Sequence, residues 1–361
     1  MKEMPVDSHY KNEKNLIGGN TMMKKICVVG AGSWGTALSK VLADNGHEVT
    51  VWSIMEKEIE MFQQFHEQKE KLPGVILPDS VTFTTNLEEG IRGKDILVFA
   101  VPSPFTRSTA KNVAPFLTDG QIIVNVAKGI EENTLMTLTE IIEEEIKNQS
   151  VEVCVLSGPS HAEEVGREIP TSVVVGAKKK ATALLLQDVF MNKVFRVYTS
   201  PDVLGIELGG SLKNVIALAA GVADGLGFGD NSKAALMTRG IAELSRLGMA
   251  MGGKRETFAG LSGIGDLIVT CGSQHSRNRK AGYLMGKGYT ADEAMKEVKQ
   301  IVEGVYSTKA AVALAKKYDV EIPIIEQVNA ILFEGKSAKE AVSDLLLRDK
   351  KIEHSDLEWD E

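Results

Sequence analysis

The chain has 361 residues, enough for about two domains, and its 43% hydrophobic and 25% charged residues are the balance of an ordinary globular protein. The net charge of −8 argues against a nucleic-acid-binding protein, because no basic face dominates. The three cysteines, Cys27, Cys154 and Cys271, show neither metal-ligand spacing nor a disulfide pattern, so we expect no metal site and a reducing cytoplasm. No apolar run approaches the roughly 18 residues of a membrane span, so none is expected.

By composition the chain divides into four segments. Residues 1–22 mix charged and polar side chains without an apolar core, and we expect them to be a disordered extension. Residues 23–200 alternate strand-like and helix-like runs, whereas strand signals nearly vanish over residues 201–348. The acidic tail of residues 349–361 is expected to be loose. The two middle segments are therefore predicted to be an α/β domain and an all-helical domain.

Eight apolar runs in the first of these domains are predicted to be strands. Most are continuous stretches rich in valine and isoleucine, as expected of strands that are covered on both faces. Their alternation with helical stretches predicts a Rossmann-like α/β fold, a doubly wound and mostly parallel sheet, followed by an all-α C-terminal domain. The expected strands are residues 25–29, 48–52, 81–84, 96–101, 122–126, 153–156, 172–175 and 194–197.

The first strand runs into a glycine-rich turn in which Gly30, Gly32 and Gly35 form the pattern G-x-G-x-x-G. The first glycine would make the turn, the second would let the backbone approach a pyrophosphate, and the third would let the next helix pack on the strand. An ordinary turn between a strand and a helix is the alternative. The flanking strands and the helix expected over residues 33–45 favour a dinucleotide-binding Rossmann domain over residues 23–200.

Two later strands end in residues suited to a ligand site. Lys128 and Gly129 follow the strand of residues 122–126, and Ser157-Gly158-Pro159-Ser160 follows the strand of residues 153–156. Because ligands of open α/β sheets collect beyond the carboxyl ends of the strands, we expect these side chains to face a ligand. A solvated loop lysine is the ordinary alternative for Lys128.

The first helix expected in the C-terminal domain, residues 203–221, is so rich in small and apolar residues that much of it should be buried. Gly209 and Gly210 each cost about 1 kcal/mol relative to alanine, which a close backbone approach would offset. Lys213 and Asn214 are the polar pair in its apolar half, and burial would lower the pKa of Lys213 toward values useful for proton transfer. A lysine that snorkels along the helix surface is the alternative.

Polar clusters also occur later in this domain. Three glycines within residues 260–265 indicate a tight turn, and Asp266 and Thr270 would share one helix face. Ser276-Arg277-Asn278 offers a guanidinium and two short polar side chains that suit a phosphate monoester, with a solvated surface arginine as the alternative. Further helices are expected at residues 233–251, 276–286, 291–298, 307–318, 324–333 and 338–347.

Taken together, six stretches resemble the bacterial type of NAD(P)-dependent glycerol-3-phosphate dehydrogenase, in register from about residue 24 to residue 347. Each stretch is modest alone, but six in the same order are specific. They are residues 30–37, 126–131, 157–162, 212–214, 263–267 and 276–278.

The resemblance implies an oxidoreductase that transfers a hydride reversibly between NAD(P)H and dihydroxyacetone phosphate, giving sn-glycerol 3-phosphate for glycerophospholipid synthesis. It implies that Lys213 donates and accepts the proton, and that Lys128 polarises the same oxygen. It also implies that Asn214, Asp266 and Thr270 orient the catalytic lysine and the substrate hydroxyls.

Two sets of binding residues are implied by the same resemblance. The substrate would be bound by Lys128, Gly158, Ser160, Lys213, Asp266, Ser276, Arg277 and Asn278. The cofactor would be bound by Gly30, Gly32, Ser33, Trp34, Gly35, Ile54, Lys128, Ala162, Arg277, Ile301 and Glu303. On residue type alone, Glu303 is as readily an ordinary loop acid.

One departure from the family leaves NADP and NAD both open as the cofactor. At the end of its second strand an NAD enzyme typically has an acid for the ribose hydroxyls, whereas an NADP enzyme offers a cation. Members of the family often place Arg or His just past the tryptophan, but here Trp52 is followed by Ser53 and Ile54. The first charges, Glu56 and Lys57, disagree in sign.

Two other functions stay open at this point. A 3-hydroxyacid dehydrogenase or ketopantoate-reductase-like enzyme also pairs such a sheet with a helical domain and a catalytic lysine, and a non-catalytic dinucleotide-sensing protein could keep the same fold. The phosphate-suited Arg277 argues against the first, and the retained Lys128, Lys213 and Asp266 argue against the second. From the resemblance we also expect a homodimer that is located in the cytoplasm and acts on a small phosphorylated substrate.

Overall fold

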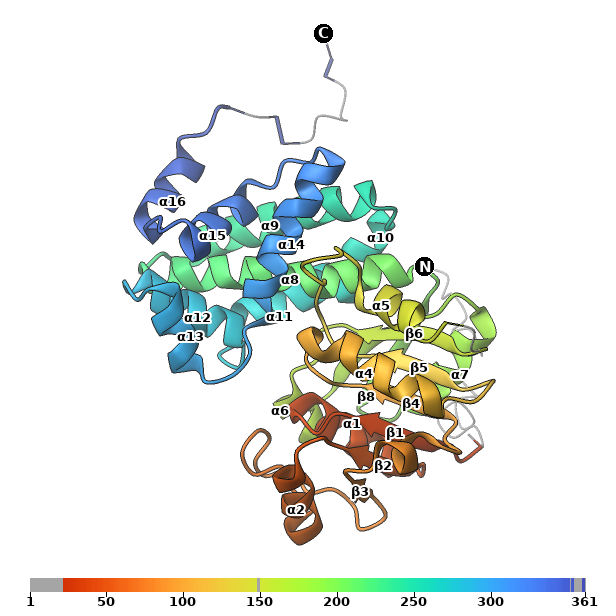
Figure 1. The fold of residues 1–361 in the computed structure, drawn as a ribbon. Helices are drawn as coiled ribbons and strands as arrows, with labels where there is room; N and C mark the ends of the chain where they lie inside the picture. Colours follow the sequence, from red (N-terminus) through yellow and green to blue (C-terminus); the bar gives the residue numbers. More distant parts are fainter. Residues whose placement is uncertain (1–21, 148–149, 351, 354–358, 361) are drawn as a thin grey trace, which may run out of the picture.

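The computed structural model describes residues 22–147, 150–350, 352–353 and 359–360 (Figure 1). The expected disorder of residues 1–22 falls outside this description except for Met22, and so does much of the expected tail of residues 349–361. Within the described residues a sheet with flanking helices is followed by an assembly of helices, which confirms the expected fold class. The two lie one above the other in Figure 1.

All eight expected strands are present in one sheet of order β3-β2-β1-β4-β5-β6-β7-β8. Neighbouring strands are parallel except for β6 and β7, which pair antiparallel, so that β7 and β8 run against the other six. The strands are β1 Lys25–Val29, β2 Glu48–Trp52, β3 Thr82–Thr84, β4 Ile96–Phe99, β5 Ile122–Asn125, β6 Glu152–Ser157, β7 Thr171–Gly176 and β8 Phe195–Ser200.

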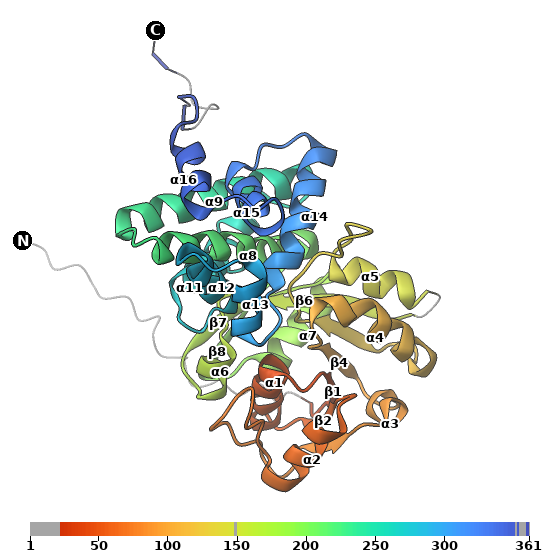
Figure 2. The same cartoon turned by 60° about the vertical axis from the view of Figure 1, so that its left-hand side comes forward.

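Helices cover both faces of the sheet, which is why the inner strands are continuously apolar. One face packs against α1, α2, α6 and α7, and the opposite face packs against α3, α4 and α5 (Figure 2). These helices are α1 Ser33–Asp44, α2 Glu56–Phe65, α3 Leu87–Ile91, α4 Thr106–Val113, α5 Leu138–Glu145, α6 Ala162–Gly166 and α7 Lys180–Phe190. Short 3₁₀ turns flank α4 at Ser103–Phe105 and Ala114–Phe116.

The glycine pattern has the geometry that its mechanism requires. Gly30 has φ +122°, and a Cβ there would lie 2.8 Å from the carbonyl carbon of Ala100. A Cβ on Gly35 would lie 2.1 Å from the carbonyl oxygen of Gly30, so only glycine lets α1 start this close to β1. Around Gly32, by contrast, there is open space within 4 Å, as needed where a pyrophosphate approaches the backbone. The observed turn therefore fits a dinucleotide.

The C-terminal residues form helices, as expected. They are α8 Val203–Gly225, α9 Asp230–Ala250, α10 Arg255–Phe258, α11 Asp266–Gly272, α12 Arg277–Gly286, α13 Ala291–Val298, α14 Glu303–Tyr318, α15 Pro323–Phe333 and α16 Ala338–Leu346. The sequence did not predict α10, and the glycine-rich stretch expected to be a tight turn forms a π-helical segment, Leu261–Gly265, that leads into α11. The expected start of α14 at residue 307 is wrong, because Gly304 packs on α8, where a Cβ would lie 2.6 Å from the carbonyl oxygen of Asn214.

Helix α8 is the core of this helical part. All but three of its residues are buried, and it contacts α9, α11, α12, α14 and α15 (Figures 1 and 2). Its length and composition would allow it to cross a membrane, but 83% of that apolar window is buried inside the structure. Its burial is therefore explained by the helices that surround it.

Candidate active site

The carboxyl ends of the central strands face α8, and the predicted lysines meet between them. Lys213 is 5% exposed on α8, and its Nζ donates hydrogen bonds to Asp266 Oδ1 at 2.5 Å and to Thr270 Oγ1 at 2.5 Å. An ammonium group has three N–H bonds, so two are satisfied by these residues and one is left for a ligand. The expected pairing of Asp266 with Thr270 on one helix face is confirmed, since Thr270 Oγ1 lies 3.4 Å from Asp266 Oδ1.

Asp266 joins the two lysines. While its Oδ1 accepts from Lys213, its Oδ2 accepts from Lys128 Nζ at 2.6 Å. The carboxylate is 1% exposed, and burial alone would raise its pKa, but the two ammonium groups hold the pKa below its usual range. Because one carboxylate carries both contacts, it fixes the separation of the two lysine nitrogens.

The environment of Lys213 changes its acidity. Burial lowers the pKa of Lys213 to about 8, with Asp266 opposing the shift and Lys128 adding to it. A buried amine with a pKa near neutral pH exists in both protonation states under ordinary conditions, as an acid–base group requires. The interpretation of Lys213 as a surface lysine is therefore wrong, because its side chain lies inside the protein.

Lys128 reaches the same point from the sheet. It follows β5 along the chain, and its Nζ also donates to the carbonyl oxygen of Gly158, at 3.2 Å, in the turn after β6. Ser160 Oγ donates to that same carbonyl at 2.9 Å. Two parallel strands thus deliver Lys128, Gly158 and Ser160 to one point, as the strand-end rule predicted, and Lys128 is not a solvated loop lysine.

The adjacent glycines of α8 allow this assembly. A Cβ on Gly209 would lie 2.6 Å from the carbonyl oxygen of Ser262 in the π-helical segment, and one on Gly210 would lie 2.8 Å from Ser157 Oγ. At the next residue, Ser211 Oγ donates to the carbonyl oxygen of Gly129 at 3.0 Å. The close backbone approach expected at these glycines is therefore present, on both sides of the helix.

A buried acid fastens α8 to the segment after Lys128. Glu207 accepts hydrogen bonds from the backbone N–H of Thr139 at 2.9 Å and from Asn125 Nδ2 at 3.3 Å. Burial raises the pKa of Glu207 to about 7. The side chain joins α5, β5 and α8, and so it holds both ends of the segment that carries Lys128.

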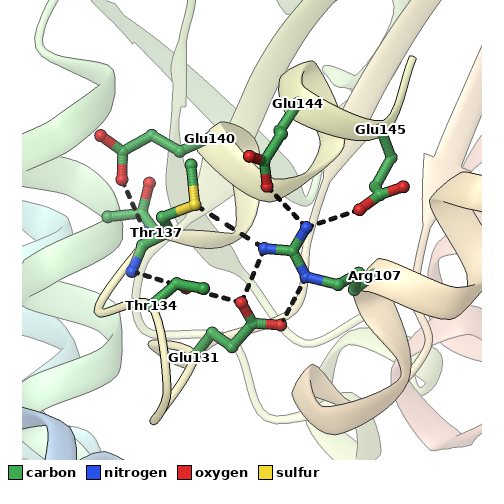
Figure 3. Close-up of polar contacts among 8 residues, drawn as sticks. Arg107, Glu131, Thr134, Thr137, Glu140, Glu144 and Glu145 are labelled. Atoms are coloured by element: carbon green, nitrogen blue, oxygen red, sulfur yellow. Dashed lines mark hydrogen bonds and ion pairs between the residues drawn. The ribbon is translucent and has the colours of Figure 1, made fainter. Parts of the chain in front are cut away.

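A second fastening lies on the outer side of the same segment. Arg107 on α4 makes a two-pronged contact with Glu131, with nitrogen–oxygen distances of 2.7 and 2.8 Å. The opposite edge of its guanidinium donates to Glu144 and Glu145 at the end of α5 (Figure 3). These ion pairs raise the pKa of Arg107, which stays charged, and they tie the turn after Lys128 to two helices.

The three residues expected to bind phosphate differ in how they are held. Arg277 is exposed at the first turn of α12, and no hydrogen bond or ion pair holds its guanidinium within the described residues. Ser276 Oγ is the N-cap of α12 and accepts from the backbone N–H of Arg279. Asn278 donates to Asn214 Oδ1 at 3.0 Å and accepts from the N–H of Gly304 at 2.8 Å. Arg277 and the positive end of α12 are thus available to an anion, while the side chains of Ser276 and Asn278 have protein partners.

Glu303 links the helical part to the sheet. At the start of α14, it accepts hydrogen bonds from both the backbone N–H and the hydroxyl of Ser103, just after β4. Burial raises its pKa, so Glu303 is not an ordinary loop acid. Ile301 precedes it half-buried, and Ala162 is buried at the start of α6.

The expected adenosine end carries both charge signs. Ser53 at the end of β2 is buried and donates to Glu58 Oε2 at 2.5 Å, and Glu58 also pairs with Lys71. Ile54, next along the chain, is 77% exposed. A cation and an acid therefore lie together where cofactor preference is decided, and the geometry favours neither NAD nor NADP.

Two family models match the chain. One, described as the N-terminus of NAD-dependent glycerol-3-phosphate dehydrogenase, matches residues 25–183, and its C-terminal counterpart matches residues 202–343. The chain belongs to this dehydrogenase family. The related enzyme classes considered above are set aside by this membership.

Individual members of the family are similar over almost the whole chain. A protein named glycerol-3-phosphate dehydrogenase (NAD(P)+) from Agathobacter rectalis is 69% identical over 337 residues, 93% of this chain and 100% of its own length. One of the same name from Fusobacterium nucleatum is 61% identical over 92% of this chain and 99% of its own. The crystal structure of glycerol-3-phosphate dehydrogenase from Coxiella burnetii matches with a TM-score of 0.86 at 36% identity, covering 90% of this chain and 99% of that one.

The sequence alone assigned no role to three residues that hold the segments around the site together. Arg107, Glu207 and Ser103 act through contacts between segments far apart in sequence, which no local pattern reveals. One signal was present for Ser103, since it stands at the carboxyl end of a strand, where ligands of such sheets collect. Glu207 also had a signal, as the only acid in the apolar helix expected over residues 203–221.

Proposed function

We propose that this chain catalyses reversible hydride transfer between NAD(P)H and dihydroxyacetone phosphate, with sn-glycerol 3-phosphate as the reduced product. The observation that carries the proposal is the buried Lys213, held by Asp266 and Thr270 with one N–H to spare, beside a turn that fits a dinucleotide. The names of the relatives supply the substrate and both cofactors. The product serves glycerophospholipid synthesis.

When bound at the turn of Gly30, Gly32 and Gly35, beside Ser33, Trp34 and Ala162, the nicotinamide nucleotide supplies or accepts the hydride. In the reducing direction, Lys213 delivers a proton from Nζ to the oxygen that becomes the secondary hydroxyl. In the oxidising direction, the neutral amine takes that proton back. A pKa of about 8 suits both tasks, because neither protonation state is costly to reach near neutral pH.

Lys128 and Asp266 set up this proton transfer. The third N–H of Lys128, which neither Asp266 nor Gly158 takes, is free to polarise the substrate oxygen. Asp266 holds the two ammonium groups at a fixed separation and limits the cost of burying them together. Asn214, held by Asn278, keeps α12 in register with α8 behind the lysine.

The substrate phosphate binds at the start of α12 in this proposal. Arg277 supplies an exposed guanidinium, and the backbone N–H groups of Arg277 and Asn278 at the start of the helix supply further donors. Ser276 and Asn278 hold that turn in place, and Ser160 and Gly158 line the path toward Lys128. Ile301 and Glu303 reach the nicotinamide side from the helical domain, and Ile54 the adenosine side.

Following the absorbance of NADH and of NADPH on addition of dihydroxyacetone phosphate tests the proposal. Oxidation of at least one nucleotide is expected, and the ratio of the two kcat/KM values decides the cofactor. If neither nucleotide is oxidised, this function is wrong.

Three further proposals concern the whole protein. We propose residues 23–200 as the dinucleotide-binding domain and residues 201–348 as the substrate-binding domain, a homodimer as the assembly and the cytoplasm as the location. The three cysteines are buried and free, which suits a reducing compartment. Light scattering coupled to size-exclusion chromatography tests the dimer, and fractionation of the source cells tests the location.

A further inference from the structure

His161 has an unsatisfied polar atom inside the site. Its Nε2 is buried and has no hydrogen-bond partner among the described residues. The side chain follows the turn that presents Gly158 and Ser160, at the carboxyl end of β6. Because a buried donor or acceptor without a partner costs free energy, such an atom calls for an explanation. A ligand that is present only during turnover would supply one.

His161 lies close both to the catalytic lysines and to the segment that leads into α12. The ammonium groups of Lys213 and Lys128 lie close enough to act on its charge, as do Asp266 and Glu163. The ring of His275 also lies close to that of His161, 5.8 Å away from centroid to centroid and tilted by 55°. His275 comes directly before Ser276 and Arg277, so the ring of His161 lies near the segment that leads into α12.

The protonation state defines what His161 can offer. Burial lowers its pKa, and the ammonium groups of Lys213 and Lys128 lower it further against the opposing carboxylates of Glu163 and Asp266. The ring is therefore neutral at neutral pH and carries one N–H donor and one acceptor nitrogen. The N–H of His161 suits an oxygen atom of an anionic ligand, because the two neighbouring lysines also favour negative charge.

We propose that His161 Nε2–H donates a hydrogen bond to an oxygen of the substrate's phosphate group, opposite Arg277 and the first turn of α12. This inference rests on the proposed function for the identity of the substrate. It assigns His161 as a substrate-binding residue, which the sequence motif left without a role between Ser160 and Ala162. The sheet thereby contributes to holding the phosphate together with the helical domain.

A matched pair of variants tests the contact. His161→Phe keeps a ring of similar size without the N–H, and His161→Gln places an amide nitrogen near the position of Nε2. The expected result for His161→Phe is a KM for dihydroxyacetone phosphate raised about 10- to 100-fold, with kcat changed by less than about threefold, as for the loss of one hydrogen bond to a charged group. His161→Gln should recover most of the loss.

Two probes distinguish a contact with the phosphate group from a contact with the reacting carbonyl. Inorganic phosphate occupies only the phosphate site, and unphosphorylated dihydroxyacetone carries only the reacting group. The inhibition constant of inorganic phosphate should rise in His161→Phe by a factor similar to that of KM, whereas kcat/KM for unphosphorylated dihydroxyacetone should stay unchanged. An unchanged phosphate constant overturns the proposal, as does an equal loss with dihydroxyacetone. Equal losses in both variants with a lowered melting temperature would mean a structural role and would also overturn it.

A direct binding measurement keeps this inference separate from the proposed function. Titration of the wild-type protein with inorganic phosphate, followed by the imidazole resonances of His161 in NMR, should show a saturable shift that is lost in Arg277→Ala. If the wild type binds phosphate in this way but does not reduce dihydroxyacetone phosphate, the proposed function fails while the contact stands. If it turns over the substrate without any shift of His161, the contact fails alone.

Discussion

The two ends of the site are held in opposite ways. At the lysine end, Lys213 and Lys128 are both hydrogen-bonded to Asp266; Lys213 and Asp266 are buried, and Lys128 is largely buried. At the phosphate end, Arg277 is exposed without a partner in the described part of the chain, and His161 Nε2 is buried without one. The protein itself thus supplies two of the three hydrogen-bond partners of each lysine that does the chemistry, whereas it leaves the groups that bind the phosphate to the substrate. Proton transfer needs fixed geometry, whereas capture of a ligand needs donors that are free.

The largest effect expected from this difference is at Lys213. Lys213→Ala removes the proton donor and leaves Asp266 with one counter-charge, so kcat should fall about 10³-fold, within the range of general acid–base catalysis. Cofactor binding, followed by nucleotide fluorescence, should survive because the lysine does not contribute to the glycine turn. Lys213→Arg is the matched control, since it keeps the charge but cannot release a proton, and it should be nearly as inactive. Activity within tenfold of wild type in either variant would place proton transfer elsewhere.

A different signature is expected at the other end, in Arg277→Ala. The loss of a charged contact to the phosphate should raise KM for dihydroxyacetone phosphate about 10- to 100-fold with little change in kcat. Arg277→Lys keeps the charge but loses the planar guanidinium, so its KM should lie between those of the wild type and Arg277→Ala. A fall in kcat with KM unchanged would mean that Arg277 acts in the chemical step, like the lysines, and not in substrate binding.

The pH dependence should follow Lys213. Oxidation of glycerol 3-phosphate needs the neutral amine, so kcat/KM should rise about tenfold per pH unit below its pKa of about 8 and level off above it. Reduction needs the ammonium form and should decline above that pH. Because Asp266 opposes the lowering of this pKa, Asp266→Asn should move the midpoint of the residual activity to lower pH. A midpoint that stays in place would mean that another group titrates.

A smaller effect is expected behind the lysine end, at Glu207. Burial raises its pKa from 4.5 to about 7, so the folded state binds more protons than the unfolded state between these values. The free energy of unfolding should therefore fall as pH rises through this window, by an amount on the order of 3 kcal/mol. Glu207→Gln should flatten the dependence in urea unfolding measured from pH 5 to 8. Glu243→Gln, at the other acid whose pKa burial raises to about 7, is the matched comparison away from Lys128.

The sequence predicts well those features that depend on the periodicity or spacing of residues close together in the chain. The eight apolar runs, the glycine turn, and the spacing of Asp266 and Thr270 each carry their own physical reason, and each is observed. The reversal of β7 is not of this kind, because an apolar run reads the same in either direction and its pairing depends on the connection. The partners of Lys213 follow the same logic. Residue type predicted a buried lysine and the family resemblance named Asp266 as a residue that orients it, but only the packing of α11 on α8 shows the ion pair between the two.

The contacts that hold the segments around the site could not be predicted from the sequence. Arg107 meets Glu131 across 24 residues of sequence, and Glu207 meets Asn125 across 82. Neither pair repeats with a helical or strand period, because the first depends on how α4 packs beside the turn after β5 and the second on how α8 packs on the sheet. His161 is similar, because its sequence position allows a solvated histidine, and only burial of Nε2 distinguishes it.

The contact between α8 and α12 has a consequence for protein engineering. Replacing a helical glycine by alanine is a standard way to raise thermal stability, worth about 1 kcal/mol at a compatible site. In this protein a methyl group on Gly221 would lie 2.0 Å from the carbonyl oxygen of Arg279, and one on Gly282 would lie 2.0 Å from that of Leu218. The same substitution would push apart the helices that carry Lys213 and Arg277. A stabilisation programme should therefore leave the glycines of this crossing unchanged and start from exposed positions elsewhere.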